Sequence, residues 1–137
     1  ADLSPGAAVS SLLLITHGDL GACLIAQARH VIGTLGLTIR VLGVEPDADP
    51  AMVEQQARSL CEDLGPDSVI LTDVYGATPS NIAHRVADGR PVVHGLNLAM
   101  LLRGHNYADL SPDELASHMV SGGQRASFSG DQPPDPF

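Results

Sequence analysis

A histidine and an aspartate each stand at the end of an apolar segment of this sequence. His17 and Gly18 follow the apolar residues 12–15, and Asp73 is the last residue of the segment 68–73. Short apolar runs bounded by turns are typical of buried parallel strands, and open α/β sheets hold their ligands at the carboxyl ends of those strands. An imidazole at such a place suits nucleophilic chemistry, because its unperturbed pKa lies close to neutral pH.

Asp73 is the residue expected to orient this imidazole. A carboxylate that accepts the Nδ1 proton of a histidine fixes the tautomer, leaves the Nε2 lone pair facing outward and stabilises the ring when it becomes cationic. The simpler alternative is that His17 and Asp73 are polar strand-end residues satisfied by neighbouring backbone groups. The nucleophilic interpretation depends on a strand order that brings the two residues together.

The segment after Asp73 has the features of an anion-binding loop. Thr78 and Pro79 stand at the start of an expected helix, where free backbone N–H groups and the helix dipole favour an anion. Gly76 and Gly18 let the backbone approach a ligand closely. An ordinary helix start is the alternative. A nucleophilic histidine, an orienting carboxylate and an anion-binding loop together indicate phosphoryl transfer through a phosphohistidine. The nucleotide-binding motifs GxxxxGKS/T and GxGxxG are absent.

Alternating apolar and amphipathic segments predict the fold that must position these residues. Strands are expected at residues 10–15, 38–44, 68–73 and 91–96, and helices at residues 20–32, 51–64, 79–87, 97–104 and 112–120. Strands separated by helices imply right-handed crossovers and a parallel sheet covered on both faces. We therefore predict a doubly wound α/β domain of three layers with strand order 2-1-3-4. That order opens a crevice at the carboxyl ends of the first and third strands.

The two ends of the chain differ in composition from its middle. Residues 1–9 form a small-residue lead, residues 10–129 form the expected domain, and the proline-rich residues 130–137 are expected to be a disordered tail. The consecutive glycines at 122–123 are expected to break the last helix. Residues 124–129 are then expected to form one more short strand.

Charge and hydropathy exclude several classes of protein. The chain has 137 residues, enough for one domain with a single core, and its net charge is −9. Its seven basic residues are all arginine, and the clustered cations that nucleic-acid binding requires are absent. No apolar run approaches the roughly 20 residues of a membrane span, and no signal-peptide pattern begins the chain, so we expect a cytoplasmic location without direct membrane insertion.

The cysteines and the remaining histidines have structural interpretations. Cys23 and Cys61 lie in helix-like patterns, which suits buried reduced thiols better than a disulfide. No H-x-x-x-H spacing occurs, so neither a metal site nor a cofactor is expected. His84 is interpreted as a surface or packing residue and His94 as a buried, neutral one.

Three motifs of the sequence resemble those of one known family. ITHG at the first expected strand, LTDVYGATPSN at the third and GLNLAML at the fourth are similar to motifs of the IIA component of the mannose family in the bacterial phosphoenolpyruvate-dependent sugar phosphotransferase system. The resemblance extends over residues 11–128. It implies that His17 accepts a phosphoryl group from the phosphocarrier HPr, with Asp73 as its hydrogen-bond partner. It also implies that Thr78 supplies a phosphoryl-contacting hydroxyl and that Asn97 borders the site.

The same resemblance implies partners. Members of the family are homodimers that exchange a C-terminal strand, for which residues 124–129 are the match here. The phosphoryl group would pass from His17 to a IIB protein, expected to be a separate chain because no IIB domain follows the tail. Asp19 and Ala77 depart from the family pattern, and Asp19 adds a negative charge near His17.

Two other functions stay open at this stage. One is a regulatory phosphoprotein, in which a partner reads the phosphorylation state of His17 and no sugar is transported. The other is a relative of the fold that only binds a small anion. Phosphorylation of His17 separates the last possibility from the first two.

Overall fold

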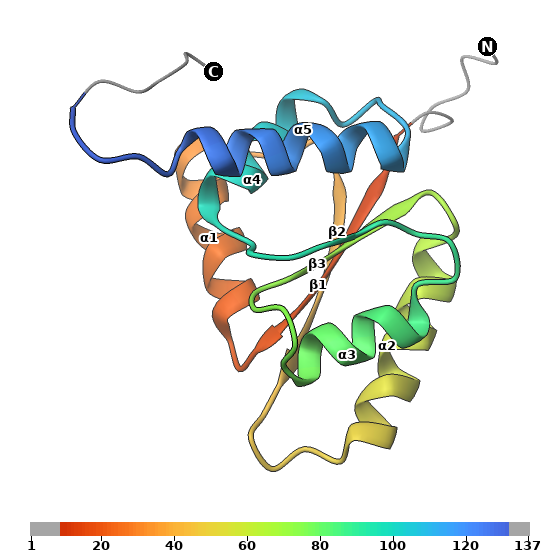
Figure 1. Cartoon of the computed structure of the whole chain (residues 1–137). Coiled ribbons are helices and arrows are strands. Elements are labelled where there is room, and N and C mark those ends of the chain that lie inside the picture. Colours follow the sequence, from red (N-terminus) through yellow and green to blue (C-terminus); the bar gives the residue numbers. More distant parts are fainter. Residues whose placement is uncertain (1–8, 132–137) are drawn as a thin grey trace, which may run out of the picture.

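A parallel sheet forms the centre of the structure, a computed structural model that describes residues 9–131 (Figure 1). The strand order is β2-β1-β3-β4, and the three neighbouring pairs are all parallel. The predicted order 2-1-3-4 is therefore confirmed. The strands are β1 Ser11–His17, β2 Thr38–Val44, β3 Ser68–Thr72 and β4 Val92–Val93. Most of the expected lead and tail, residues 1–8 and 132–137, lies outside the described residues.

Helices cover both faces of the sheet, which gives the three layers (Figure 1). β1 is buried on both sides: Leu12 and Leu14 pack in one apolar cluster with α1, α4 and α5, while Leu13 and Ile15 pack in another with α2 and α3. No helix in the described part of the chain has the length and hydropathy needed to cross a bilayer. The helices are α1 Leu20–Ile32, α2 Pro50–Leu64, α3 Thr78–Val86, α4 Leu98–Asn106 and α5 Pro112–Arg125.

The register brings the ends of the two central strands to one edge of the sheet. Ile15 on β1 pairs with Thr72 on β3, and His17 on β1 pairs with Val44 at the end of β2. Because the strands run parallel, His17 and Asp73 both emerge at this carboxyl edge. The order of the strands thus brings His17 and Asp73 together, as the nucleophilic interpretation requires.

β4 is shorter than the expected strand at residues 91–96. Only Val92 and Val93 pair with β3. The chain leaves the ladder at His94 and turns at Gly95, before the Leu96 N–H donates to the carbonyl of Thr72 at 3.0 Å. This turn takes His94 out of the strand and places it beside β3.

The C-terminal part of the domain also differs from the expectation. α5 continues through Gly122 and Gly123 to Arg125, so the expected break at 122–123 is wrong, and within the single chain residues 124–129 form no strand. A Cβ on Gly122 would lie 2.7 Å from a side-chain carbon of Arg103, and one on Gly123 would lie 2.8 Å from Met100. The two glycines therefore permit close packing of α5 on α4 and do not mark a turn.

Candidate functional site

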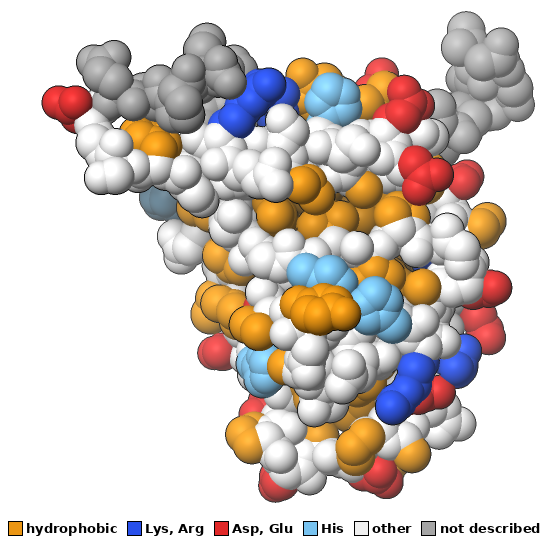
Figure 2. All heavy atoms as spheres, in the orientation of Figure 1, with side chains coloured by type: hydrophobic (Ala, Val, Ile, Leu, Met, Phe, Trp, Pro, Cys, Tyr) orange, Lys and Arg blue, Asp and Glu red, His pale blue; other side chains and the backbone are white. Residues whose placement is uncertain are grey.

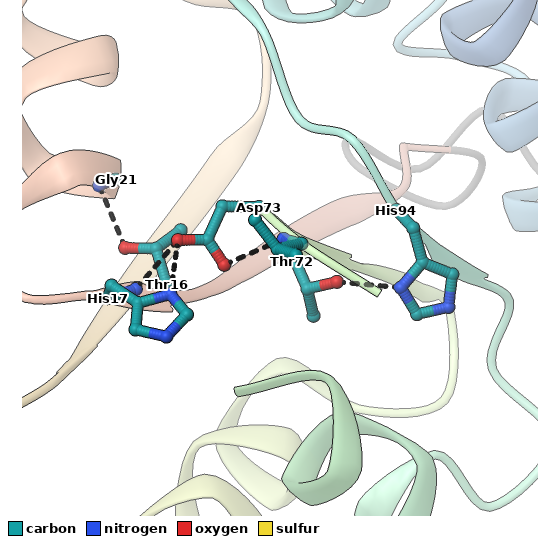
Figure 3. Close-up of polar contacts among 7 residues, drawn as sticks. Thr16, His17, Gly21, Thr72, Asp73 and His94 are labelled. Atoms are coloured by element: carbon teal, nitrogen blue, oxygen red, sulfur yellow. Dashed lines mark hydrogen bonds and ion pairs between the residues drawn. The ribbon is translucent and has the colours of Figure 1, made fainter. Parts of the chain in front are cut away.

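His17 and Asp73 meet at the carboxyl edge of the sheet, as Figure 3 shows. Asp73 Oδ2 accepts a hydrogen bond from the backbone N–H of His17 at 2.9 Å and lies 2.9 Å from His17 Nδ1. The other carboxylate oxygen accepts from the N–H of Val74 at 2.9 Å. An ionised carboxylate has no hydrogen to donate, so Nδ1 carries the proton and the Nε2 lone pair stays free.

The two partners differ in exposure and charge. The side chain of His17 is 54% exposed, whereas that of Asp73 is only 6% exposed. Burial disfavours the Asp73 anion, but the hydrogen bonds from His17 and Val74, together with the charge of His17, outweigh it and hold the pKa of Asp73 below its ordinary value of 3.8. An anchored anion thus supports an imidazole that an incoming molecule can reach.

Thr16 holds the turn that follows His17, a role that the sequence analysis missed. The side chain of Thr16 is fully buried, and its Oγ1 accepts from the N–H of Gly21 at 2.9 Å. Asp19 occupies the N-cap position of α1, but its side chain makes no capping hydrogen bond. Thr16 therefore supplies the acceptor that such a helix start requires. The sequence signal for this role was the spacing of five residues between Thr16 and Gly21.

Gly43 leaves room for the same turn because it has no side chain. A Cβ at this position of β2 would overlap the carbonyl group of Gly18, which is backbone and cannot move aside as a flexible side chain can. Gly18 is itself held on β2, since its N–H donates to the carbonyl of Val44 at 2.9 Å. The apolar pattern of residues 38–44 contains no sign of this role, because the contact joins β2 to the turn after β1.

The other expected site residues are placed in different ways. Thr78 is the exposed first residue of α3, and the N-cap residue Ala77 makes no side-chain capping bond, so the first N–H groups of this helix have no side-chain cap. Gly76 precedes them with φ +87°. Asn97 instead caps α4, where its Oδ1 accepts from Met100 N–H at 3.0 Å. Within residues 9–131, neither the Thr78 nor the Asn97 side chain hydrogen-bonds to the histidine–aspartate pair.

A pair of histidines lies on the other side of β3. Figure 3 shows that Thr72 and Asp73, neighbours in sequence, point in opposite directions, Thr72 toward His94 and Asp73 toward His17. Thr72 Oγ1 lies 2.8 Å from His94 Nδ1, and His94 Nε2 lies 3.2 Å from His84 Nε2. Burial, and then the charge of His84, lower the pKa of His94 below its ordinary value of 6.5. The sequence analysis treated these two histidines separately and did not predict that they meet.

The sequence matches a known family model. The model describes the PTS system fructose IIA component, and the match extends over residues 11–119. No curated protein sequence matches the chain.

Solved structures resemble the fold over most of its length. The mannose/sorbose specific IIA subunit of the phosphotransferase system from Enterococcus faecalis is 24% identical, with 93% of this chain and 99% of that one covered and a TM-score of 0.81. A PTS IIA protein associated with the fucose utilization operon of Streptococcus pneumoniae is 22% identical, with coverages of 88% and 93% and a TM-score of 0.73. The phosphotransferase system component EIIA of Streptococcus agalactiae is 17% identical, with coverages of 87% and 95% and a TM-score of 0.77. At these identities the likeness concerns the fold.

Proposed function

We propose that this chain, which belongs to the family of PTS fructose IIA components of the mannose type, carries a phosphoryl group on His17 Nε2. The observation that carries the proposal is the hydrogen bond between His17 Nδ1 and Asp73 Oδ2. It occupies one ring nitrogen, so the exposed one is the nucleophile. The donor is phosphorylated HPr and the acceptor is a IIB protein, both acting in the cytoplasm.

Transfer to this chain is a displacement at phosphorus. The Nε2 lone pair of His17 attacks the phosphoryl group of the donor, the bond between phosphorus and the donor atom breaks, and the donor atom keeps that electron pair. The phosphorylated ring is cationic while Nδ1 keeps its hydrogen, and the Asp73 anion offsets this charge. Attack by the acceptor on the same phosphorus returns His17 to its neutral form.

The start of α3 is the proposed cradle for the phosphoryl oxygens. Its uncapped N–H groups carry partial positive charge, and the hydroxyl of the exposed Thr78 can donate a further hydrogen bond. Gly76 and Gly18, which have φ of +87° and +48°, place no side chain at these two positions of the neighbouring loops. Asn97 borders the site as the cap of α4 and positions that helix.

We also propose that the protein is a homodimer in which a C-terminal segment of each chain pairs with the other. Support comes from β4, which is the outer strand of the sheet and has backbone groups free to pair on one side. A groove of about 360 Å³ runs between β4 and α5, with Val92, Val120 and Gln124 among its lining residues. An extended segment from a partner fits such an edge.

Phosphorylation of the purified chain tests the carrier proposal. We expect incubation with phosphoenolpyruvate, Enzyme I and HPr to add one phosphoryl group, seen by intact-mass spectrometry at mildly alkaline pH and lost on acidification. The adduct should be absent in His17→Ala and present in His30→Ala, which removes an exposed histidine of α1. Labelling of His17→Ala would refute the assignment. Addition of a IIB protein separates the two roles, because a carrier loses its phosphoryl group to it and a regulatory phosphoprotein keeps it.

A further inference from the structure

Two imidazoles from separate elements present the same ring nitrogen to each other. His84 lies on α3, and His94 lies in the turn after β4. Their Nε2 atoms are 3.2 Å apart, with ring centroids 5.1 Å apart and ring planes tilted by 35°. The carrier reaction proposed for His17 uses neither residue.

Neighbouring groups fix the orientation of this pair. Thr72 Oγ1 lies 2.8 Å from His94 Nδ1, so the hydroxyl oxygen can accept the Nδ1 hydrogen and leave the Nε2 lone pair of His94 free. Tyr75 packs edge-on against both rings, at centroid distances of 5.0 Å from His94 and 6.4 Å from His84. A hydrogen-bond partner on the second ring nitrogen is the arrangement that orients histidines at metal centres.

The separation of the two nitrogens suits a tetrahedral metal ion. Zinc–imidazole bonds are about 2.0–2.1 Å long, so two nitrogens 3.2 Å apart on one zinc ion subtend an angle of about 100° at the metal, close to the tetrahedral value. We propose that His84 and His94 bind Zn²⁺ through their Nε2 atoms. Without the metal, one Nε2–H donates to the other Nε2. Binding then requires only that the neutral donor ring moves its hydrogen to Nδ1.

The site is open to solvent. His84 and Tyr75 are exposed, and Figure 2 shows histidine side chains beside a hydrophobic one in the middle of the face it presents. Within residues 9–131 no group of three or more His, Cys, Asp and Glu side chains is arranged to hold a metal ion. Water therefore completes the coordination of the zinc ion in the isolated chain. Structural zinc sites are closed by four protein ligands, so a site with two imidazoles and solvent differs from them.

Calorimetric titration of the full chain with Zn²⁺, in a buffer that does not bind the metal, tests the proposal without any phosphoryl donor. We expect one saturable site. Loss of an outer-shell partner costs roughly 10- to 100-fold in metal affinity, and loss of a direct ligand should cost no less, so we expect His84→Gln and His94→Gln each to weaken binding by at least about 10-fold. His30→Gln should bind as the wild type does, and so should Cys23→Ser, which removes an exposed thiol.

Three outcomes would overturn the proposal. Absence of saturable binding to the wild-type chain would mean that the two rings only hydrogen-bond to each other. Equal affinity of the wild type and both glutamine variants, with circular dichroism confirming that the variants are folded, would place the zinc elsewhere. A loss of binding in His17→Ala with none in His84→Gln would assign the metal to the histidine–aspartate pair. Each result is independent of whether His17 accepts a phosphoryl group.

Discussion

A single oxygen of Asp73 accepts hydrogen bonds from both the backbone N–H and the Nδ1 of His17, each at 2.9 Å. The first bond fixes the end of β1, and the second fixes the rotation and tautomer of the ring. The position and the tautomer of the proposed nucleophile therefore depend on the same buried carboxylate.

Asp73→Asn should slow phosphoryl transfer more than it affects the fold. An amide is neutral and stabilises the cationic phosphorylated ring less than a carboxylate does. We expect the rate of phosphorylation by phospho-HPr to fall at least roughly 10- to 100-fold, the range known for loss of the hydrogen-bond partners of metal-bound histidines. Rapid-quench labelling measures this rate. Asp67→Asn is the matched control, because it removes an exposed carboxylate just before β3, at the opposite end of this strand from Asp73. Equal rates for the wild type and Asp73→Asn would show that Asp73 does not orient the ring.

Asp73 should also make stability depend on pH at the acid end. Its pKa in the folded chain is below the ordinary value of 3.8, so folding favours the anion. The stabilisation is complete above the unfolded-state pKa and is lost as the pH falls through the folded-state pKa. In urea titrations from about pH 6 to about pH 2, we expect the free energy of unfolding to decline less steeply for Asp73→Asn than for the wild type below about pH 4. Parallel pH profiles for the two proteins would contradict this prediction.

Gly43→Ala should disturb the site although Gly43 lies on β2, which supplies none of the proposed reacting residues. The new methyl group would overlap the carbonyl of Gly18, so the turn after His17 must shift. We expect a loss of about 1–3 kcal/mol in the free energy of unfolding, as for other overpacked sites, together with slower phosphorylation. Gly36→Ala is the matched control, since its Cβ would make only ordinary contacts of 3.6 Å or more. If the two variants have the same stability and rate, Gly43 has no positioning role.

Removal of residues 126–137 tests the proposed strand exchange. The deletion starts after the last residue of α5 and leaves the described helices whole. We expect sedimentation analysis to show the wild type as a dimer and the shortened chain as a monomer at the same concentration. Phosphorylation of His17 in the shortened chain serves as the control that the domain is folded. Dimers of equal stability before and after the deletion would exclude exchange of this segment.

Local patterns in the sequence predicted the strands and helices, and the doubly wound order 2-1-3-4 assumed for them placed His17 and Asp73 at one edge of the sheet. Apolar runs such as residues 12–15 report burial on both faces, and alternation of strands with helices restricts the topology. His17 and Asp73 were identifiable as candidates because each follows such a run after a single threonine. The hydrogen bond between them then follows from the parallel pairing of β1 with β3.

Only the tertiary structure revealed the contacts between distant segments. The glycines at 122–123 predicted a break, yet they lie inside α5, because α4 packs so closely that larger side chains do not fit. The fit of Gly43 against Gly18 and the meeting of His84 with His94 likewise join different elements. Sequence periodicity reports which face of an element is buried. It carries no information about the distance to the atoms of the opposing element, and that distance decides both steric fit and hydrogen bonding.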